Sequence, residues 1–371
     1  MQQPLFKDML VIELASVLAG PSVGMFFAEQ GARVIKIEHP GTGGDVTRGW
    51  KLPSENKAST ISAYFSSVNW GKESVVLDLG STPGQEAAHE LIKEASIVIT
   101  SFLPTTASKL QMSPKKLMEL NPYLIVGQIS GYGPEEERAA YDAIIQAEAG
   151  FTYLNGEAGV GNCKMPVALM DILAAHHLKE AILLAILERH QTGKGKHVEV
   201  SLLGAGLCSL ANQASNWLVA GHLPEPLGSA HPNIVPYGTV FSCQENEQVI
   251  LAVGSDKQFL QVGKLLGLTT QTWKTNQQRV QDRAAIEAAI QTKLTHWNRK
   301  EFLEACRVHL IPAGAVNRVD QACDLPIARK LMHEAGKLTG FKSLATFEDT
   351  YAPISAPPEL GAHQDVVFPP A

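Results

Sequence analysis

The stretch that decides the fold class is MLVIELASVLAGPSVGMFFAEQGARVIKIE, residues 9–38. Its first part, 9–15, is a short apolar run of strand-forming residues and predicts a strand. The middle part is typical of a helix that ends at Gly31, and RVIKIE at 33–38 predicts a second strand. Because the connections are short, the two strands are expected to be parallel within one strand–helix–strand unit.

The same alternation continues along the first half of the chain. Further strands are predicted at 74–79, 96–102 and 124–133, with helices at 84–95 and 113–121. A long helix is expected within 166–190, and a strand running into another helix at 196–218. This alternation predicts an open α/β sheet with helices on both faces.

A second domain is indicated by a shift to proline and glycine at 220–238, which predicts a linker. Beyond it the sequence predicts two strands and then three helices, at 238–243, 248–254, 256–266, 283–292 and 299–308. We therefore expect a large domain at 1–220 and a small domain with its linkers at 221–329. The C-terminal stretch from residue 353 carries no packing pattern and is expected to be loop.

The composition, 45% hydrophobic and 18% charged over 371 residues, is that of a globular protein with a large core. A formal charge of −6 and the lack of a long basic run argue against a nucleic-acid partner. Five scattered cysteines without a C-x-x-C pair argue against disulfides or zinc and favour a reducing cytoplasm. No signal-peptide layout or membrane-length apolar window is found, so no membrane partner is expected.

One carboxylate, Asp171, stands inside the mostly apolar stretch PVALMDILAAHHLKEAILLAILERH, residues 166–190. It can be a helix N-cap, a position that Asp fills well. The same geometry suits a nucleophile, because the helix dipole and free N–H groups would keep the carboxylate ionised at neutral pH. In the second case the side chain should be exposed in a cleft.

Other motifs in the sequence give weaker evidence of a functional site. GEAGVGN at 156–162 does not follow a strand and open a helix, and TGKGK at 192–196 lacks the P-loop frame, so both are expected to be turns or loops. His176 and His177 do not form H-E-x-x-H, so core packing or partial exposure is their expected role and a metal site is a minor alternative. The absence of G-x-S-x-G disfavours a serine hydrolase.

The segment KIEHPGTGGDVTRGW, residues 36–50, leaves a predicted strand and carries Lys36, His39 and Arg48. Loops at this place lie at the ligand-binding edge of open α/β sheets. A solvated surface loop explains the same residues equally well.

Taken together, the chain resembles the family III CoA-transferases, also called the CaiB/BaiF family. The matching stretches run in order along nearly the whole chain: VIELASVLAGP, GARVIKIEHPGTGGDVTRG, VNWGKESVVLDL, NPYLIVGQISGYG, YDAIIQAEAG, ALMDILAAHHLKEAILLAILERHQTGKGKHVEVSLL, HPNIVPYGTVF, IPAGAVNRV and PPELGAHQD. Each motif alone is weak, but their order and spacing are specific.

The resemblance implies a fold in which a large Rossmann-like α/β domain is completed by the chain end, 330–371, and a smaller α+β domain lies between. It also implies an obligate, interlocked homodimer. The family's catalytic Asp corresponds to Asp171 in ALMD, followed by the turn in ERHQTGKG. In the implied reaction Asp171 takes the acyl group of an acyl-CoA as a mixed anhydride, then carries CoA as a thioester to an acceptor carboxylic acid. Acyl-CoA is a substrate, and no ATP, metal, nicotinamide or flavin is needed.

The resemblance further implies CoA contacts at Leu18, Ala19, His39, Leu77, Phe102 and Lys109. The family often has a basic residue at the His39 position, for nucleotide phosphate, and Asn at the Ser101 position. The anion contact is therefore expected to be weaker or pH-dependent, or to be taken over by Lys109 or Arg48. The stretch DILAAHH after Asp171 is also bulkier than the family's usual Ser/Thr-Gly sequence.

Two alternatives stay open. A racemase branch of the family uses a His where this chain has Tyr141, and a tyrosine with an ordinary pKa near ~10 is a poor base at neutral pH. A degenerate member that binds acyl-CoA without transferring it is the second alternative. The acceptor acid is not readable, although His231, Asn233 and Tyr237 are candidates to contact it or to pack the domain junction.

Overall fold

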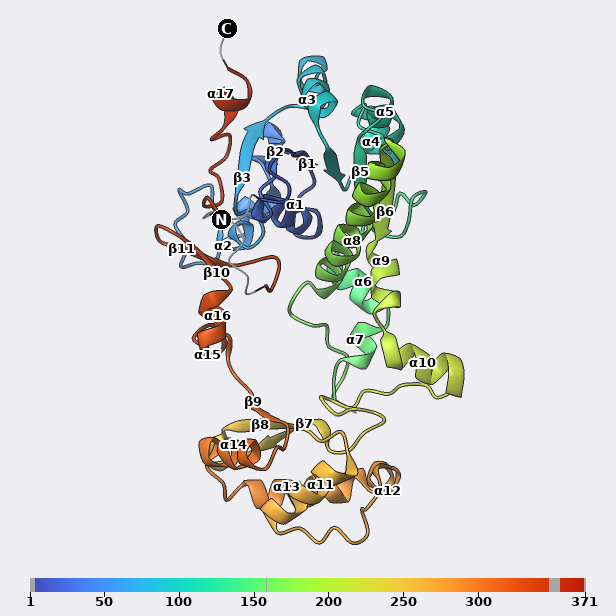
Figure 1. Cartoon of the computed structure of the whole chain (residues 1–371), viewed down its shortest axis with the longest axis vertical. Coiled ribbons are helices and arrows are strands. Elements are labelled where there is room, and N and C mark those ends of the chain that lie inside the picture. Colours follow the sequence, from blue (N-terminus) through green and yellow to red (C-terminus); the bar gives the residue numbers. More distant parts are fainter. Residues whose placement is uncertain (1–3, 158, 347–353, 370–371) are drawn as a thin grey trace. The chain divides into compact units, whose positions relative to one another are not determined.

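The computed structural model describes residues 4–157, 159–346 and 354–369 (Figure 1). They form two compact units. The first unit comprises Met1–Ala149, Pro166–Leu210 and Pro326–Ala371, and the second comprises Gly150–Met165 and Ala211–Leu325. The chain thus crosses between units after 149, 165, 210 and 325, whereas the sequence predicts the division at 220 and 329.

The first unit is built on a six-stranded sheet in which every neighbouring pair is parallel. Its strands are β1 (Leu10–Leu14), β2 (Arg33–Glu38), β3 (Lys72–Val76), β4 (Ile97–Thr100), β5 (Ile125–Ser130) and β6 (Lys196–Ser201). They are ordered β3-β2-β1-β4-β5-β6. The prediction of an open α/β sheet is therefore confirmed.

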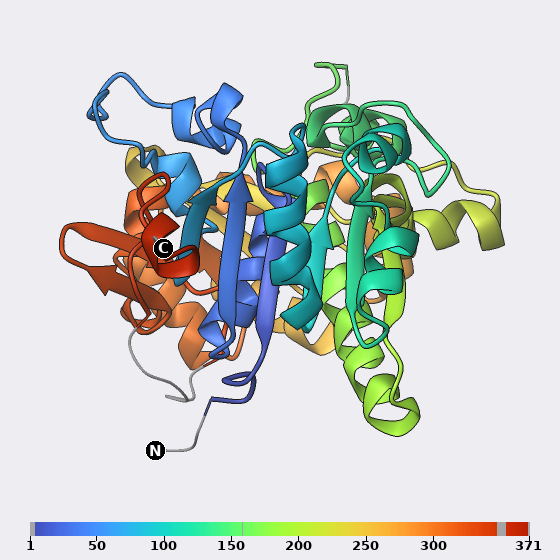
Figure 2. The same ribbon diagram turned by 90° about the horizontal axis from the view of Figure 1, so that it is seen from above.

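Two layers of helices cover this sheet, as Figure 2 shows from above. Helices α3 (Thr82–Glu94) and α5 (Pro114–Leu120) pack on one face, where Ile92 and Leu117 meet the strand residues Ile12 and Val126. Helices α1 (Ala19–Glu29) and α8 (Leu169–Thr192) pack together on the other face. Gly127 of β5 allows α8 to lie close, because a Cβ there would be 2.7 Å from Ile182 Cδ1.

The remaining elements of the first unit connect or flank these layers. They are η1 (Pro40–Thr42), η2 (Val46–Gly49), α2 (Ala63–Ser66), α4 (Pro104–Lys109), α6 (Asp142–Glu148), α9 (Leu202–Cys208), α16 (Pro326–Lys330), β10 (Met332–Ala335), β11 (Leu338–Phe341) and α17 (Gln364–Val367). Strands β10 and β11 form an antiparallel hairpin.

The strand order decides where a ligand can enter. The chain moves outward from β1 to β3 and then returns to the other side of β1 to add β4, β5 and β6. The loops after β1 and β4 therefore diverge at the carboxyl edge of the sheet. In open α/β sheets, this reversal point is where ligands bind.

The C-terminal stretch is loop over 354–363, as predicted, and continues into the short helix α17; it is nevertheless packed against the sheet, which its sequence pattern did not indicate. Strand β3 is an edge strand with backbone groups that no further strand pairs. The backbone N–H of Ser74 donates to His363 Nδ1 at 3.2 Å, and that of Val76 donates to Gln364 Oε1 at 2.9 Å. Side chains from the tail thus cover an open sheet edge, a function that has no periodic sequence signature.

The second unit has its own core and a small antiparallel sheet. Its strands are β7 (Tyr237–Ser242), β8 (Gln248–Ala252) and β9 (Ala313–Ala315), in that order. Its helices are α7 (Phe151–Leu154), α10 (Ala211–Ala220), η3 (Gln244–Asn246), α11 (Asp256–Leu266), α12 (Asn276–Gln281), α13 (Arg283–Leu294), α14 (Arg299–Val308) and α15 (Val319–Cys323). Helices α11, α13 and α14 bury Phe259, Ile290 and Phe302 against the sheet. Throughout the described residues, no helix is long and apolar enough to cross a bilayer.

A buried group of charges ties β1, β2 and β3 to helix α1. Glu13 Oε1 lies 2.8 Å from Lys36 Nζ, and Glu13 Oε2 lies 2.7 Å from Lys72 Nζ. Gly24, in the middle of α1, makes room for this carboxylate, because a Cβ there would be 1.9 Å from Glu13 Oε2. A helix interior normally favours Ala over Gly, so the need for space outweighs helix propensity here.

We expect Gly24→Ala to lower the free energy of unfolding by about 1–3 kcal/mol, because the added methyl displaces a buried, paired carboxylate. Chemical denaturation measures this change. Gly49→Ala is the matched control, because a Cβ there meets nothing within 4 Å. A Gly24→Ala protein as stable as the wild type would mean that Glu13 can move away without loss.

Candidate functional site

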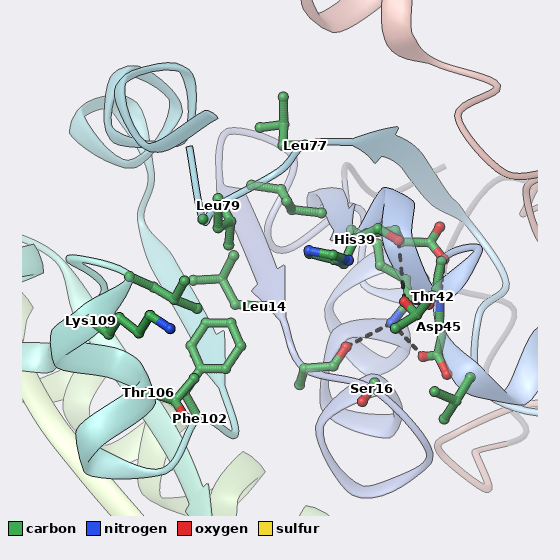
Figure 3. A pocket seen from close by; sticks show the side chains of 18 residues that line it. Leu14, Ser16, His39, Thr42, Asp45, Leu77, Leu79, Phe102, Thr106 and Lys109 are labelled. Atoms are coloured by element: carbon green, nitrogen blue, oxygen red, sulfur yellow. Dashed lines mark hydrogen bonds and ion pairs between the residues drawn. The ribbon is translucent and has the colours of Figure 1, made fainter. Parts of the chain in front are cut away.

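A large hollow of about 490 Å³, which we call the His39 hollow, opens at the carboxyl edge of the sheet (Figure 3). It is lined by residues that follow β1, β2, β3 and β4: Leu14, Ala15, Ser16, Lys36, Ile37, Glu38, His39, Thr42, Gly44, Asp45, Val46, Leu77, Leu79, Gly80, Phe102, Thr106, Lys109 and Leu110. Its position at the reversal of strand order marks it as a candidate ligand site.

The His39 hollow combines apolar walls with three basic side chains, of which Lys36 is buried and paired with Glu13 and Asp45. Leu77, Leu79 and Phe102 form part of the walls, and His39 and Lys109 point into the hollow from opposite sides (Figure 3). Within the described residues, Lys109 makes no ion pair or hydrogen bond through its ammonium group. The hollow can therefore hold an anionic ligand that also has apolar surface.

Arg48 does not line either hollow described here, so its expected role as a phosphate contact needs correction. It is 4% exposed, and its guanidinium donates to both oxygens of Glu38 at 2.7 Å and to the carbonyls of Thr60 and Pro358. A guanidinium with its donors committed in this way is part of the fold, because breaking a buried ion pair is costly.

A second hollow, which we call the Asp171 hollow, has a volume of about 260 Å³. It is lined by Ser16, Val17, Leu18, Ala19, Gly20, Ser101, Phe102, Leu103, Pro104, Ile129, Ser130, Gly131, Glu136, Arg138, Ala139, Ala140, Tyr141, Asp171 and Leu202. Ser16 and Phe102 line both hollows. A ligand that fills the His39 hollow is thus adjacent to the space in front of Asp171.

Asp171 lies in the first turn of helix α8, which begins at Leu169. The N-cap position belongs to Ala168, so the prediction that Asp171 is the N-cap is wrong. Asp142 supplies the missing acceptor, because its Oδ1 accepts a hydrogen bond from the Met170 N–H at 2.8 Å. Among the described residues, nothing donates a hydrogen bond to the Asp171 carboxylate, which leaves its oxygens available to a ligand.

The environment makes Asp171 a weak acid. Asp171 lines the hollow but is only 8% exposed, so the expectation that a nucleophilic Asp171 would be exposed in a cleft is wrong. Burial together with the neighbouring Asp142 carboxylate raises the pKa of Asp171 to about 7. About half of the molecules would carry the charge at neutral pH, so the expectation of full ionisation by the helix dipole needs correction. Burial and the Asp171 and Asp142 charges also raise the pKa of Tyr64, a half-buried side chain of α2.

Backbone donors complete the Asp171 hollow. Leu18, Ala19 and Gly20, which line it, form the start of helix α1. Leu18 occupies the N-cap and provides no side-chain cap, so the first N–H groups of the helix have no intrahelical acceptor. Donors of this kind stabilise an oxyanion when they face the reacting carbonyl.

The expected contact residues divide between the two hollows. Leu18 and Ala19 line the Asp171 hollow, whereas His39, Leu77 and Lys109 line the His39 hollow, and Phe102 lines both. The second unit holds the acceptor candidates: the His231 and Tyr237 rings meet edge to face at 5.2 Å, and the Asn233 carbonyl accepts from Asn276 at 2.8 Å.

Two residues that border Asp171 or its hollow escaped sequence reasoning: Asp142 and Arg138. Asp142 directly follows Tyr141, the residue that the racemase alternative compares with a catalytic His. The Tyr141–Asp142 dipeptide was therefore the sequence feature that could have pointed to Asp142. Arg138 is the one Lys, Arg or His among the described residues that line the Asp171 hollow. Its guanidinium lies 3.5 Å from the Tyr132 ring centroid and 3.3 Å from a Glu148 oxygen.

Comparison with known proteins is consistent along the whole chain. Residues 6–364 match the family described as CoA-transferase family III. A succinate–glutarate CoA-transferase of Agrobacterium fabrum is 36% identical over 86% of this chain and 82% of its own. An acetyl-CoA:oxalate CoA-transferase of Acetobacter aceti is 30% identical over 89% and 86%.

The fold agrees with these relatives. The crystal structure of a CAIB/BAIF family protein from Brucella suis superposes with a TM-score of 0.85 at 34% identity and covers 99% of both chains. The relatives named above are CoA-transferases, and the match includes both the sheet and the segment around Asp171. The chain is therefore an enzyme that belongs to CoA-transferase family III.

Proposed function

We propose that this enzyme moves CoA from an acyl-CoA thioester to a carboxylic acid through covalent intermediates on Asp171. The observation that carries the proposal is a buried carboxylate with no hydrogen-bond donor among the described residues, set in a hollow beside the free N–H groups of a helix start. Such a carboxylate can reach a thioester carbonyl as a nucleophile.

The reaction proceeds in two balanced halves. In the first, an Asp171 oxygen attacks the thioester carbon, the C–S bond breaks, and CoA leaves as a thiolate, which gives a mixed anhydride. The thiolate then attacks the aspartyl carbonyl and releases the donor acid, which gives an aspartyl-CoA thioester. In the second half, the acceptor carboxylate attacks this thioester, and the returning thiolate takes the acceptor acyl group. Asp171 is restored, and acyl activation is conserved throughout.

The raised pKa of Asp171, about 7, suits this role. A carboxylate that holds its proton more tightly is a stronger nucleophile once it is ionised, and enzymes tune catalytic groups toward the working pH. The charge that leaves Asp171 in the first step develops on the thioester oxygen. The N–H groups at Ala19 and Gly20, which line the hollow at the start of α1, are backbone donors that could stabilise this charge.

The CoA part of the substrate fits the His39 hollow in this proposal. Lys109 and His39 would meet phosphate oxygens, while Leu77 and Phe102 pack against apolar atoms of the cofactor portion. Leu18 and Ala19 then lie beside the thioester. His39 Nδ1 accepts the Gly41 N–H at 3.0 Å, so a neutral ring can donate only through Nε2, which lies 3.6 Å from Asp78 Oδ1. Lys109 therefore carries the larger share of this anion contact.

The acceptor is proposed to be a dicarboxylic acid. One carboxylate would react at Asp171, and the other would meet Arg138, whose planar guanidinium suits carboxylates. The names of the relatives point the same way, since succinate, glutarate and oxalate are all dicarboxylic acids.

We also propose an obligate, interlocked homodimer in the cytoplasm. Trp217, Leu218 and Val219 of helix α10 are 54, 79 and 85% exposed in the single chain, which supports a partner that covers them. The five cysteines are all free, as a reducing compartment favours.

Mass spectrometry after incubation with succinyl-CoA or acetyl-CoA, followed by hydroxylamine, should find a hydroxamate at Asp171. Asp171→Asn should prevent this adduct and lower CoA transfer by about a thousandfold or more. Asp320→Asn, at an exposed ion pair with Arg318, is the matched control and should leave both unchanged.

Measurements on the same samples distinguish the transferase from the racemase and from the acyl-CoA-binding protein. Deuterium entering C2 of a 2-methylacyl-CoA without any Asp171 adduct would favour the racemase. Acyl-CoA binding with no adduct and no transfer would favour a binding protein.

The pH dependence of adduct formation should follow Asp171. Since the ionised form attacks, the rate should rise through pH 7 and fall about tenfold for each pH unit well below it. Asp142→Asn removes the neighbouring like charge but keeps an acceptor for the Met170 N–H. It should therefore shift the profile to lower pH, and an unmoved profile would assign the pH dependence to another group.

Two substitutions should affect the two substrates separately. Lys109→Ala should raise the apparent KM for acyl-CoA by about tenfold and leave that for the acceptor unchanged, because it removes a phosphate contact. With glutarate as acceptor, Arg138→Gln should raise the apparent KM for the acceptor and leave that for acyl-CoA unchanged. Each variant is the control for the other, and equal effects on both constants would contradict the assigned positions.

A further inference from the structure

The turn between β1 and α1 contains a strained residue. Val17 has a φ of +73°, in the left-handed region that β-branched side chains rarely adopt. It lines the Asp171 hollow, and the preceding Ser16 lines both hollows. Strain of this kind persists where surrounding groups hold the backbone in place.

Asp45 holds this residue through its backbone. Both carboxylate oxygens lie 3.3 Å from the Val17 N–H, which donates a bifurcated hydrogen bond. Asp45 is itself fixed, because its Oδ1 accepts from the N–H and the hydroxyl of Thr47, and its Oδ2 lies 2.9 Å from Lys36 Nζ. The carboxylate therefore cannot follow the loop if the loop moves.

The same charge group holds the turn at two further points. Lys36 Nζ donates to the Ala15 carbonyl at 2.8 Å, and Lys72 Nζ donates to the Pro21 carbonyl at 2.8 Å. Both lysines pair with Glu13 and are about 1% exposed. Three backbone groups between residues 15 and 21 are thus bound from below by buried charges.

We propose that Asp45 and Lys36 are positioning residues for the transfer reaction, because they hold Val17 in its left-handed conformation and so aim the first N–H groups of α1 at the substrate carbonyl in front of Asp171. This inference rests on the proposed function of Asp171. Neither residue needs to touch the reacting atoms, since each acts through the backbone of the turn. A small displacement of aligned donors is enough to slow a reaction strongly.

The two charges serve this purpose better than neutral groups would. Burial alone would lower the pKa of Lys36, but Glu13, Asp45 and Glu38 raise it overall, so the ammonium stays charged. Lys36 in turn lowers the pKa of Asp45 against the effect of burial. The pair is therefore ionised across the pH range in which Asp171 titrates, and its hold on Ala15 and Val17 does not change as Asp171 gains or loses its proton.

The test uses Asp45→Asn in the full-length enzyme, with succinyl-CoA and glutarate as substrates. The change keeps the size of the side chain but places an amide toward Lys36 or Val17. We expect kcat to fall between about tenfold and a hundredfold with little change in either KM, because the lost interaction acts in the transition state. Hydrogen exchange of a peptide covering residues 15–21 should become faster in the same variant.

A second substitution provides the rescue. Glycine adopts a positive φ without strain, so Val17→Gly added to Asp45→Asn should restore kcat at least about threefold. Asp256→Asn is the matched control: it also weakens a pair with a buried cation, Arg279, but lies in the second unit and outside both hollows. It should lower stability without the change in kcat or in exchange at 15–21.

If Asp45→Asn prevents folding, Val17→Pro tests the same idea with the charges intact. Proline has no N–H for Asp45 and cannot reach a φ of +73°, so kcat should fall to the same degree when it is measured well below the lowered melting temperature of this variant. The proposal is overturned if either variant leaves kcat and exchange at the wild-type level, or if the kcat loss of Asp45→Asn is not rescued by Val17→Gly. A wild-type enzyme that transfers no CoA would refute the proposed function instead, while the exchange measurement would still decide whether Asp45 holds the turn.

Discussion

All six strands of the large sheet run in one direction, and this constraint determines where the chemistry can occur. Parallel strands place every carboxyl end at the same edge, so residues that are far apart in the sequence meet there. Because the strand order reverses beside β1, the loops after β1 and β4 separate and leave room between them. Both hollows use this gap, and Ser16 and Phe102, which border both, come from the two loops that diverge.

The Asp171 hollow reflects a compromise between burial and reactivity. Removing a carboxylate from water favours its neutral form, and the neighbouring Asp142 adds to this effect. The Asp142 and Asp171 carboxylates have different roles at the start of α8. Asp142 accepts the Met170 N–H that a capping residue would take, and this leaves Asp171 without a donor among the described residues. A catalytic Asp that also capped its helix would be held away from the substrate and would be a weaker nucleophile.

Local sequence patterns were enough to predict the α/β sheet and most of its elements, because strand–helix alternation and capping residues such as Ser113 act over short distances. The resemblance supplied the family and the enzyme class, which are confirmed. Local patterns could not reveal that Asp142 caps α8, since the two segments are separated by 28 residues. The same limit hid the tail residues that cover β3 and the commitment of Arg48 to Glu38. These contacts depend on tertiary arrangement, and a loop residue such as Arg48 looks identical in sequence whether it faces solvent or a buried carboxylate.

The proposed site depends on backbone N–H groups more than on polar side chains. Leu18 stands at the N-cap of α1 and offers no side-chain acceptor to the first N–H groups, so in the proposed reaction these backbone donors remain available to the oxyanion. Backbone donors have no rotamers, and their direction depends entirely on the conformation of the turn that carries them. The direction of these N–H groups is then set by the buried ion pairs beneath the turn, which hold the backbone of Ala15, Val17 and Pro21. This arrangement explains why charged side chains that would be costly to bury alone are gathered in the strands below a largely apolar site. When they are paired with each other, these side chains can hydrogen-bond to backbone groups of the turn and fix their positions, whereas apolar side chains could only pack against them.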